Sequence, residues 1–436
     1  MRAEMEAMRA QMQAMDAKID GLESQLAAEK ARAVAVPPAP PPAPSITAKT
    51  ATTIAWDGAP RIEAAVDPKN PDAGRWSFKP RGRLQLDVAG VDAPNAIGGN
   101  GLGVATEVRR AYLGFEGTLP GNFGYRLEAD VATSAVELID FWITYKASPE
   151  LTLTVGQHKP FTGLEEQTSD IFTNFMERAA FTSAFGFERR VGVSATWVGK
   201  TVLVQGGVFA DNAADLNSDV NNSYSIDARA AFQPKLAGGQ LHLGGSFHNR
   251  EFNDVTTTAR YRARPFVHTT DLRLIDTRAF SASGERSLGL EAAWTSGRFH
   301  AAAESAWMTA RRPGGLANPT FNGGYAELGY FLTGDTLPYK AGDGSWNRIK
   351  PKHGLDKGGL GAFQVNARYD WLDLSDGVVV GGRQQVAGAS LLWVPTDYLR
   401  FIVNYGHLWI DDAAVAAGAD RKYTADSIGM RAQIDF

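Results

Sequence analysis

From about residue 77 to the C-terminus, apolar and polar side chains alternate along the chain. Between Phe123 and Val131 the odd-numbered residues are aromatic or aliphatic, and the even-numbered residues are glycine or charged. The last segment, Ile428–Phe436, alternates in the same way. A period of two is the pattern of an extended strand with two different faces. Because the polar faces carry many charges over about ten residues, the pattern favours a membrane barrel with lipid outside and water inside.

Sixteen segments of this kind follow one another. They lie near 78–89, 106–117, 122–132, 137–147, 150–158, 189–198, 201–210, 223–233, 239–249, 286–296, 298–309, 321–333, 361–373, 384–394, 398–410 and 425–436. Short connections alternate with long ones at 90–105, 158–188, 211–222, 250–285 and 374–383, while 334–360 is long although it falls on the short-turn side. This asymmetry is typical of bacterial outer-membrane barrels. We predict an all-β protein in which residues 77–436 form a sixteen-stranded antiparallel transmembrane β-barrel.

Composition removes several other classes of protein. None of the 436 residues is Cys, which excludes disulfides and Cys-ligated metal sites. The formal net charge of -4 gives no general attraction to nucleic acid, so we expect no nucleic-acid partner. No stretch approaches the 18 consecutive apolar residues of a membrane-spanning helix. Because Met1 opens directly into a polar helix pattern, we expect the numbering to begin at a mature end or at an added Met.

Residues 1–34 carry a heptad pattern. Apolar residues recur at alternating spacings of four and three from Met1 to Leu26, which predicts an N-terminal α-helical coiled coil. A single helix that docks on its own protein is the alternative. Because so polar a helix needs partner chains, the arm predicts an oligomer, although its Met-rich seam leaves the number of chains open. Residues 35–76 follow as a Pro-rich linker, with a semi-rigid spacer at 36–44, and an irregular or short-strand segment that leads into the barrel.

Three arginines, Arg260, Arg262 and Arg264, alternate with other residues in one short stretch. In an extended backbone their guanidinium groups lie on one face, about 7 Å apart. Each unpaired charge in a dry core would cost several kcal/mol, so this face needs water, acidic partners or an anionic ligand. In an isolated soluble protein a solvated edge explains such a stretch. In a barrel with a wet interior, it indicates a surface that attracts anions.

Enzyme motifs are missing from the sequence. There is no P-loop, HExxH or GxSxG pattern, and the 7 His are scattered. We therefore expect no enzyme activity, no cofactor and no metal site.

Several segments together resemble the phosphate- and polyphosphate-selective porins (O/P type) of Gram-negative outer membranes. They are Trp76–Gln85, Arg109–Leu113, Gly163–Glu165, Met176–Arg178 and Leu332–Gly334. The resemblance covers roughly residues 75–436. It implies a homotrimer of sixteen-stranded barrels in which loops and one long periplasmic turn fold inward to narrow each pore. It also implies a ladder of arginines that leads anions to a lysine-lined constriction.

The resemblance implies anion-binding residues. The ladder would comprise Arg83, Arg109, Arg110, Arg178, Arg260, Arg262 and Arg264. The inward turn 334–360 would bring Lys340 and Lys350 into the pore, with 158–188 and 250–285 as the inward loops, and Tyr112 would be a lumen aromatic. Independently of the resemblance, the predicted strand register places counter-charges on the same inner face: Asp87, Glu116, Glu128, Asp130 and Asp140.

The sequence departs from the family pattern at a few positions. Glu166 stands where the family's phosphate porins have a lysine, and we expect Lys159 to replace part of the charge. His268 stands where the next ladder arginine would be. Arg109 and Arg110 are adjacent, so a regular strand cannot aim both inward. Either a bulge turns one of them, or one lies at the rim or at a subunit interface.

Two kinds of function follow from these patterns. The first is a bacterial outer-membrane channel for passive diffusion of phosphate or polyphosphate, with the N-terminal arm in the periplasm. The alternative is a general, mildly anion-preferring porin, since Glu166 removes a central positive charge. In that alternative the coiled-coil arm, residues 1–34, also tethers the outer membrane to the cell wall or to a periplasmic partner.

Overall fold

The computed structural model describes residues 15, 17–25, 27, 52–56, 59–65, 75–98, 102–216, 222–253 and 255–436. The chain divides into two units, Met1–Lys49 and Thr50–Phe436. In the first unit, the described residues 15, 17–25 and 27 are helical. None of the described helices is long and apolar enough to cross a membrane. Most of the heptad lies outside the described residues, so the coiled coil stays a prediction.

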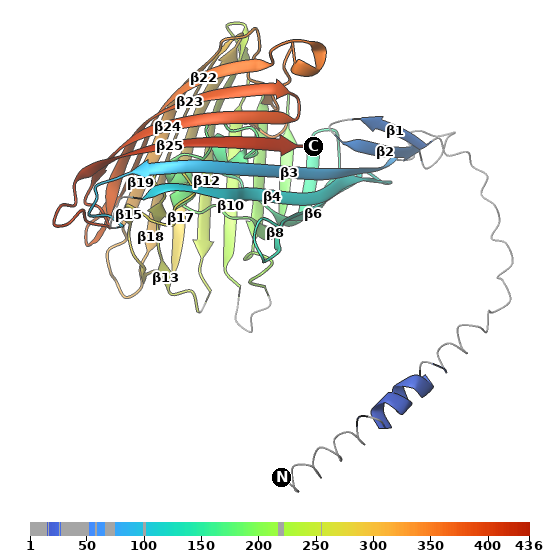
Figure 1. The fold of residues 1–436 in the computed structure, drawn as a ribbon, viewed down its shortest axis with the longest axis horizontal. Coiled ribbons are helices and arrows are strands. Elements are labelled where there is room, and N and C mark those ends of the chain that lie inside the picture. Colours follow the sequence, from blue (N-terminus) through green and yellow to red (C-terminus); the bar gives the residue numbers. More distant parts are fainter. Residues whose placement is uncertain are drawn as a thin grey trace, which may run out of the picture. The chain divides into compact units, whose positions relative to one another are not determined.

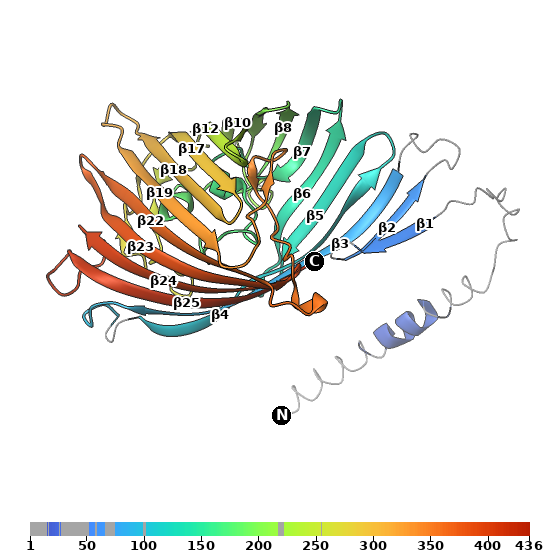
Figure 2. The same ribbon diagram turned by 90° about the horizontal axis from the view of Figure 1, so that it is seen from above.

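The second unit is a closed antiparallel barrel (Figures 1 and 2). Within the described part of residues 75–436, its sixteen wall strands are β3 (Arg75–Asp92), β4 (Gly103–Leu119), β5 (Phe123–Asp130), β6 (Glu137–Lys146), β7 (Leu151–His158), β8 (Arg190–Val198), β9 (Val202–Phe209), β10 (Tyr224–Phe232), β12 (Gly239–Glu251), β17 (Gly284–Ser296), β18 (Phe299–Arg311), β19 (Thr320–Phe331), β22 (Ala362–Asp376), β23 (Val379–Thr396), β24 (Leu399–Asp411) and β25 (Tyr423–Asp435). Each strand pairs with the next, and β25 closes the barrel on β3. The predicted strand number and order are confirmed.

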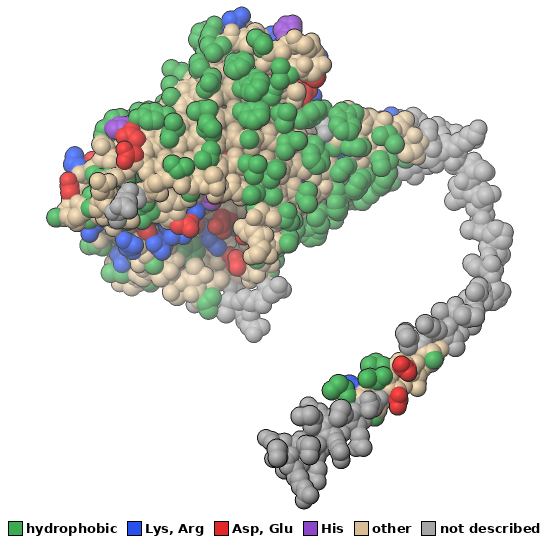
Figure 3. Space-filling model, in the orientation of Figure 1, with side chains coloured by type: hydrophobic (Ala, Val, Ile, Leu, Met, Phe, Trp, Pro, Cys, Tyr) green, Lys and Arg blue, Asp and Glu red, His purple; other side chains and the backbone are tan. Residues whose placement is uncertain are grey.

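Burial in this barrel is inverted relative to a soluble sheet. On β3, Leu84 and Leu86 are 36% and 45% exposed, whereas Gln85 and Asp87 between them are 0% and 4% exposed. The same alternation places apolar side chains over the outer surface of other strands, where they are visible in Figure 3. An apolar outer wall around a polar interior is the arrangement that a lipid environment requires.

A short hairpin extends the sheet at the short-turn end. Its strands are β1 (Thr52–Trp56) and β2 (Pro60–Ala65). β2 pairs with residues 75–78 of β3, beyond the part of β3 that pairs with β25. We expected residues 35–76 to be a Pro-rich linker followed by an irregular or short-strand segment that leads into the barrel. β1 and β2 are short strands within this range, and they continue the barrel sheet from β3.

Three connections fold into the barrel. The first, 158–188, contains α2 (Leu164–Gln167) and α3 (Ala180–Ala184). The second, 250–285, contains β13 (Thr258–Ala259), β14 (Arg262–Ala263), β15 (Ile275–Asp276) and β16 (Phe280–Ser281), and the third, 334–360, contains β20 (Tyr339–Lys340), β21 (Ser345–Trp346) and the 3-10 helix η2 (Leu355–Lys357). Phe175 and Phe266 join the first two, with ring centroids 5.8 Å apart. Phe266 also packs on the inward side of Gly388 and Gly406, where a Cβ would meet its ring.

The interior is only partly polar, which the sequence pattern did not predict. Inward-facing side chains of β18, β19, β23 and β24 form an apolar core with the inward loops. It includes Met308, Phe321, Leu392, Ile402 and Leu408, all fully or nearly fully buried. The inward faces of β3–β6 stay charged. The charged part of the interior therefore lies along one side of the barrel.

Candidate functional site: the pore

Three neighbouring cavities lie inside the barrel, and we call them the inner, central and outer cavity. Their volumes are about 610, 220 and 450 Å³. The inner cavity reaches the C-terminal Phe436 at the short-turn end, and the outer cavity is lined by the connection 250–285 at the long-loop end. Asp170 lines both the inner and the central cavity. Arg109 and Arg178 line both the central and the outer cavity, so the three cavities follow one another along the barrel.

The lining of the outer cavity contains more cationic than anionic side chains. Its charged lining consists of Arg109, Arg178, Arg260, Arg262, Arg264 and Arg273 against Glu177 and Glu188. Tyr261 and Ala263 are buried between the three arginines of the stretch, which therefore share one face as predicted. The stretch lies in an inward loop rather than on a wall strand. Figure 3 shows Lys and Arg side chains gathered at the barrel edge near the place of β15 in Figure 1.

The arginines of the stretch differ in their partners. Arg260 and Arg264 each lie 2.9 Å from a carboxylate oxygen, of Asp276 and Asp271 respectively. Arg262 has no carboxylate within ion-pair distance among the residues that the structure describes, which leaves its charge available to a passing anion. Burial, together with Arg264 and Arg262, lowers the pKa of Arg273 to about 10.

A bulge brings two adjacent arginines into the central cavity. Gln85 of β3 pairs with Arg110 and the next residue, Leu86, pairs with Val108, so Arg109 is the extra residue. Arg109 binds the Glu177 carboxylate in a fork, at 2.9 and 3.0 Å. The bulge, one of the two predicted alternatives for the adjacent Arg109 and Arg110, is therefore present. Both arginine side chains line the central cavity.

The central Arg110 and its counter-ion belong to different elements. The Nε of Arg110 on β4 lies 2.7 Å from the Asp170 carboxylate of the inward loop. Burial alone would raise the pKa of Asp170, but Arg83 and Arg110 hold it well below its usual value. Asp170 is therefore an anion that occupies the place between these two arginines.

Glu166 neutralises the charge that was expected from Lys159. The Lys159 Nζ lies 2.9 Å from Glu166, and the Nε of Arg178 lies 3.4 Å from the same carboxylate. Burial, followed by repulsion from Arg178, lowers the pKa of Lys159 to about 8. The charged lining of the central cavity is Arg109, Arg110 and Arg178 against Glu166, Asp170, Glu177 and Glu188. Three cations face four anions there, so this cavity is not a positive constriction.

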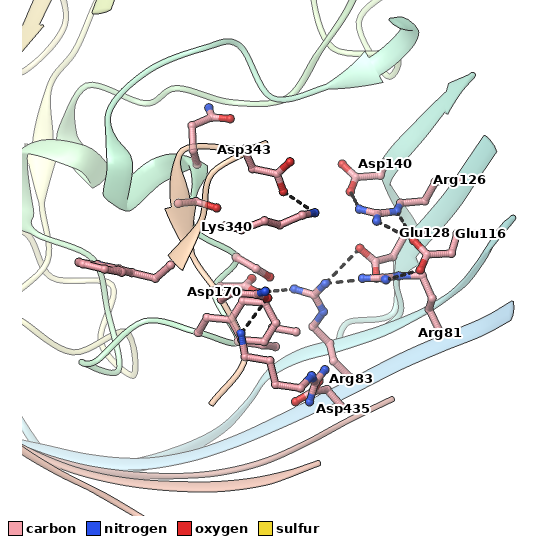
Figure 4. A pocket seen from close by; sticks show the side chains of 18 of the residues that line it. Arg81, Arg83, Glu116, Arg126, Glu128, Asp140, Asp170, Lys340, Asp343 and Asp435 are labelled. Carbon is pink, nitrogen blue, oxygen red and sulfur yellow. Dashed lines mark hydrogen bonds and ion pairs between the residues drawn. The ribbon is translucent and has the colours of Figure 1, made fainter. Parts of the chain in front are cut away.

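An unbroken ribbon of ion pairs covers one wall of the inner cavity (Figure 4). In order, it contains Asp170, Arg83, Glu128, Arg81, Glu116, Arg126, Asp140 and Arg189. The four arginines and four carboxylates alternate, so the ribbon has no formal net charge. Arg81, Arg126 and Arg189 were missed by the sequence reasoning. Arg81 had a signal, because it shares the inward parity of Arg83.

The predicted counter-charges divide into three cases. Glu116, Glu128 and Asp140 belong to the ribbon. Asp87 pairs with Arg431 at 2.7 Å. Asp130 instead accepts hydrogen bonds from backbone N–H groups, including that of Ala111 at 3.1 Å.

The remaining predicted site residues lie on either side of the central cavity. Lys340 and Lys350 line the inner cavity. Lys340 pairs with Asp343 at 2.6 Å. Within the described chain, no carboxylate lies within ion-pair distance of Lys350. His268 lines the outer cavity and lies 2.8 Å from a carboxylate oxygen of Glu107.

Tyr112 lies on the inner face of the barrel, beside Arg83. Its ring lies under the Arg83 guanidinium, 4.5 Å from ring centroid to Cζ, and the residue is 6% exposed. In the described part of the chain, no group of three or more His, Asp or Glu is arranged to hold a metal ion.

Comparison with known proteins identifies the family. Residues 78–436 match the family described as phosphate-selective porin O and P. The chain is 27% identical over 369 residues to Porin O of Pseudomonas aeruginosa, which covers 76% of this chain and 81% of that protein. It is 45% identical over 437 residues to a Caulobacter vibrioides protein of unassigned function, covering 95% and 86% of the two chains.

Solved structures share the architecture. A loop-deletion mutant of the Vibrio cholerae outer membrane protein OmpT matches with a TM-score of 0.54 and 9% identity, covering 83% of this chain and 99% of that one. An anion-selective porin from Comamonas acidovorans matches with a TM-score of 0.52 and 11% identity, covering 83% and 100%. These matches show the fold alone. With the family match over the whole barrel, they establish that this chain belongs to the phosphate-selective porin O and P family and is an outer-membrane channel.

Proposed function

We propose that the channel carries anions by passive diffusion and prefers phosphate or polyphosphate. The outer cavity, with six arginines and two glutamates, carries this proposal. A guanidinium offers a planar fork of N–H groups that pairs with oxyanions in two places. A narrow lumen also screens charge incompletely, so the cavity concentrates anions and repels cations. The family description supports the same substrate class.

Transport requires that an anion leaves each site as well as enters it. Arg109 and Arg178 line both the outer and the central cavity, so they can pass an anion from one to the other. Their partners Glu177 and Glu166 compete with the anion for the same donors. This competition weakens each site, which favours conduction over retention. Lys350, without an acidic partner among the described residues, then offers a site in the inner cavity.

A second candidate is a general porin with a mild preference for anions. The four carboxylates of the central cavity favour it, because they cancel the positive charge that a strict phosphate filter needs. The two candidates differ in their affinity for phosphate, while both predict that chloride passes more readily than potassium.

Single-channel recording in a planar bilayer separates the candidates. The reversal potential under a KCl gradient measures chloride over potassium, and a phosphate titration then measures block. Strong anion selectivity with block at low phosphate concentration supports the phosphate channel. Anion selectivity without block leaves the general porin, and cation selectivity would refute both.

We also propose that the channel is a homotrimer whose N-terminal arm, residues 1–34, lies in the periplasm. The heptad from Met1 to Leu26 supports this assembly role. A tether to the cell wall or a periplasmic partner is the alternative role. Deletion of residues 1–45 distinguishes them: weaker trimers with normal envelopes support assembly, whereas fragile envelopes with intact trimers and unchanged conductance support the tether.

A further inference from the structure

The outer wall of β12, β17 and β18 carries a polar patch at its long-loop end. These three strands lie side by side (Figures 1 and 2). Three successive rows of directly paired, outward-facing residues can be followed across them. The first row is Phe247, Leu288 and Trp307, the second is Asn249, Arg286 and Thr309, and the third is Glu251, Gly284 and Arg311.

The first row belongs to the apolar outer wall of the barrel. Phe247, Leu288 and Trp307 are 37%, 54% and 42% exposed. Aromatic residues in such positions gather at the membrane–water interface of outer-membrane barrels. The second row lies two residues farther along each strand, or about 7 Å toward the long-loop end. An outward arginine is costly at the bilayer midplane and costs little near the membrane surface, which favours a position of Arg286 near the lipid headgroups.

Arg286 is available to a ligand. It is exposed, and among the described residues no carboxylate lies within ion-pair distance of it. Arg311, in the next row, is by contrast held by Glu251 and by the carbonyl oxygen of Arg250. The pair of Arg311 and Glu251 is neutral, so Arg286 leaves the described patch with one net positive charge.

The two neighbours of Arg286 can add hydrogen bonds. Asn249 on β12 and Thr309 on β18 lie directly opposite Arg286 in the sheet, one on each side. The Thr309 hydroxyl lies 2.8 Å from that of Thr320 on β19. An arginine fork flanked by an amide and hydroxyls is suited to a phosphate or carboxylate that also carries sugar hydroxyls.

We propose that Arg286, with Asn249 and Thr309, binds the anionic headgroup of an outer-leaflet glycolipid on the outside of the barrel. Charge complementarity and depth in the membrane select this occupant. The acyl chains of such a lipid would lie along the apolar row of Phe247 and Trp307 below. This site is separate from the pore, since its side chains point away from the three cavities.

The test uses the full chain in detergent micelles and diphosphoryl lipid A as the probe, with native mass spectrometry to count bound lipid. Arg286→Gln should weaken lipid binding at least about tenfold, because charge-assisted hydrogen bonds are lost. Arg286→Lys, which keeps the charge but loses the fork, should give an intermediate affinity. Arg298→Gln is the matched control, since Arg298 is exposed at the opposite end of the same β17–β18 hairpin. It should bind lipid as the unmodified chain does.

Three results would overturn the proposal. Equal lipid binding by Arg286→Gln and Arg298→Gln would show that Arg286 is not the site. Displacement of the lipid by millimolar inorganic phosphate would show that the site takes a free ion. Loss of subunit association in Arg286→Gln, with lipid binding unchanged, would assign the surface to a second copy of the chain. Conductance of Arg286→Gln should stay normal, which keeps this test independent of the proposed pore function.

Discussion

Glu166 is the residue whose replacement most directly tests how charge controls this pore. Glu166→Gln removes one of the four carboxylates of the central cavity and keeps the size of the side chain. It also releases Lys159 and Arg178, which lie 2.9 and 3.4 Å from the carboxylate. We expect stronger chloride-over-potassium selectivity and tighter block by phosphate.

The size of the effect follows from Coulomb's law. At about 6 Å, removing one negative charge favours a passing anion by about 0.7 kcal/mol at the dielectric constant of water and by about 3 kcal/mol at an effective value of 20. The expected gain in phosphate affinity therefore lies between about threefold and about one hundredfold. The carboxylate is mostly buried, with 12% of its side chain exposed, so the lower limit is a conservative expectation.

The assay must keep Lys159 charged. Its pKa is about 8, and Glu166 is one of the groups that raise it, so the substitution lowers it further. Recordings at pH 6 avoid this loss of charge, and Glu150→Gln in the exposed β6–β7 turn is the matched control. If Glu166→Gln at pH 6 matches the control in both reversal potential and phosphate block, the charge of the central cavity does not govern permeation and our reasoning is wrong.

Four further predictions concern other charges along the pore. As pH rises through about 8, the folded channel loses the Lys159 charge, so anion selectivity should fall between pH 7 and 9. This fall in selectivity should be absent in Lys159→Arg. A fall with the same midpoint in the variant would contradict the assignment to Lys159. Folding lowers the pKa of Lys159, so between about pH 8 and the ordinary lysine pKa the unfolded chain binds more protons than the folded chain. Lys159 should therefore make the free energy of unfolding rise with pH in this range. The unfolding temperature of Lys159→Arg, measured across the same range, should lack this contribution. Arg262→Gln should weaken phosphate block by about threefold to fivefold, since it removes an unpaired charge from the outer cavity, whereas Arg298→Gln should not. Asp170→Asn leaves Arg83 and Arg110 without their shared partner and should cost about 3–5 kcal/mol of stability, seen as a lower unfolding temperature; an unchanged temperature would show that the loop is held by other contacts.

Strand-level features were predictable because they depend on local periodicity. The outward and inward faces of β3, β5 and β25 follow from alternation alone. The bulge at Arg109 was foreseen as one alternative, since two adjacent arginines violate a period of two. The apolar core inside the barrel was not foreseen. On β18, inward Ala302 and Met308 alternate with outward Ala303 and Trp307, so both faces appear apolar. Which face is covered by protein depends on loops that return from far along the chain.

The site was predictable only where its residues lie on strands. Arg83 and Glu128 share an inward face by parity, and they pair in the structure. Asp170 and Glu177 lie in a long loop, where parity carries no information. Their contacts with Arg110 and Arg109 depend on how the loop crosses the lumen. The resemblance correctly indicated inward loops. It could not indicate that carboxylates of these loops would form ion pairs with the arginines predicted for the ladder.

This occupation changes what the arginine ladder can do. In the outer cavity, Arg262 has no acidic partner in the described chain, so no carboxylate competes with an anion for its guanidinium. In the central cavity each arginine already binds a carboxylate. The binding free energy of an incoming anion there is therefore only the difference between its own interaction with the arginine and that of the carboxylate it replaces. A divalent oxyanion can compete with a single carboxylate through its higher charge, whereas chloride, which cannot form a paired fork, competes less well. If the channel carries phosphate as proposed, the internal carboxylates would keep each site weak, and Glu166 would lower the affinity of the central cavity for an anion.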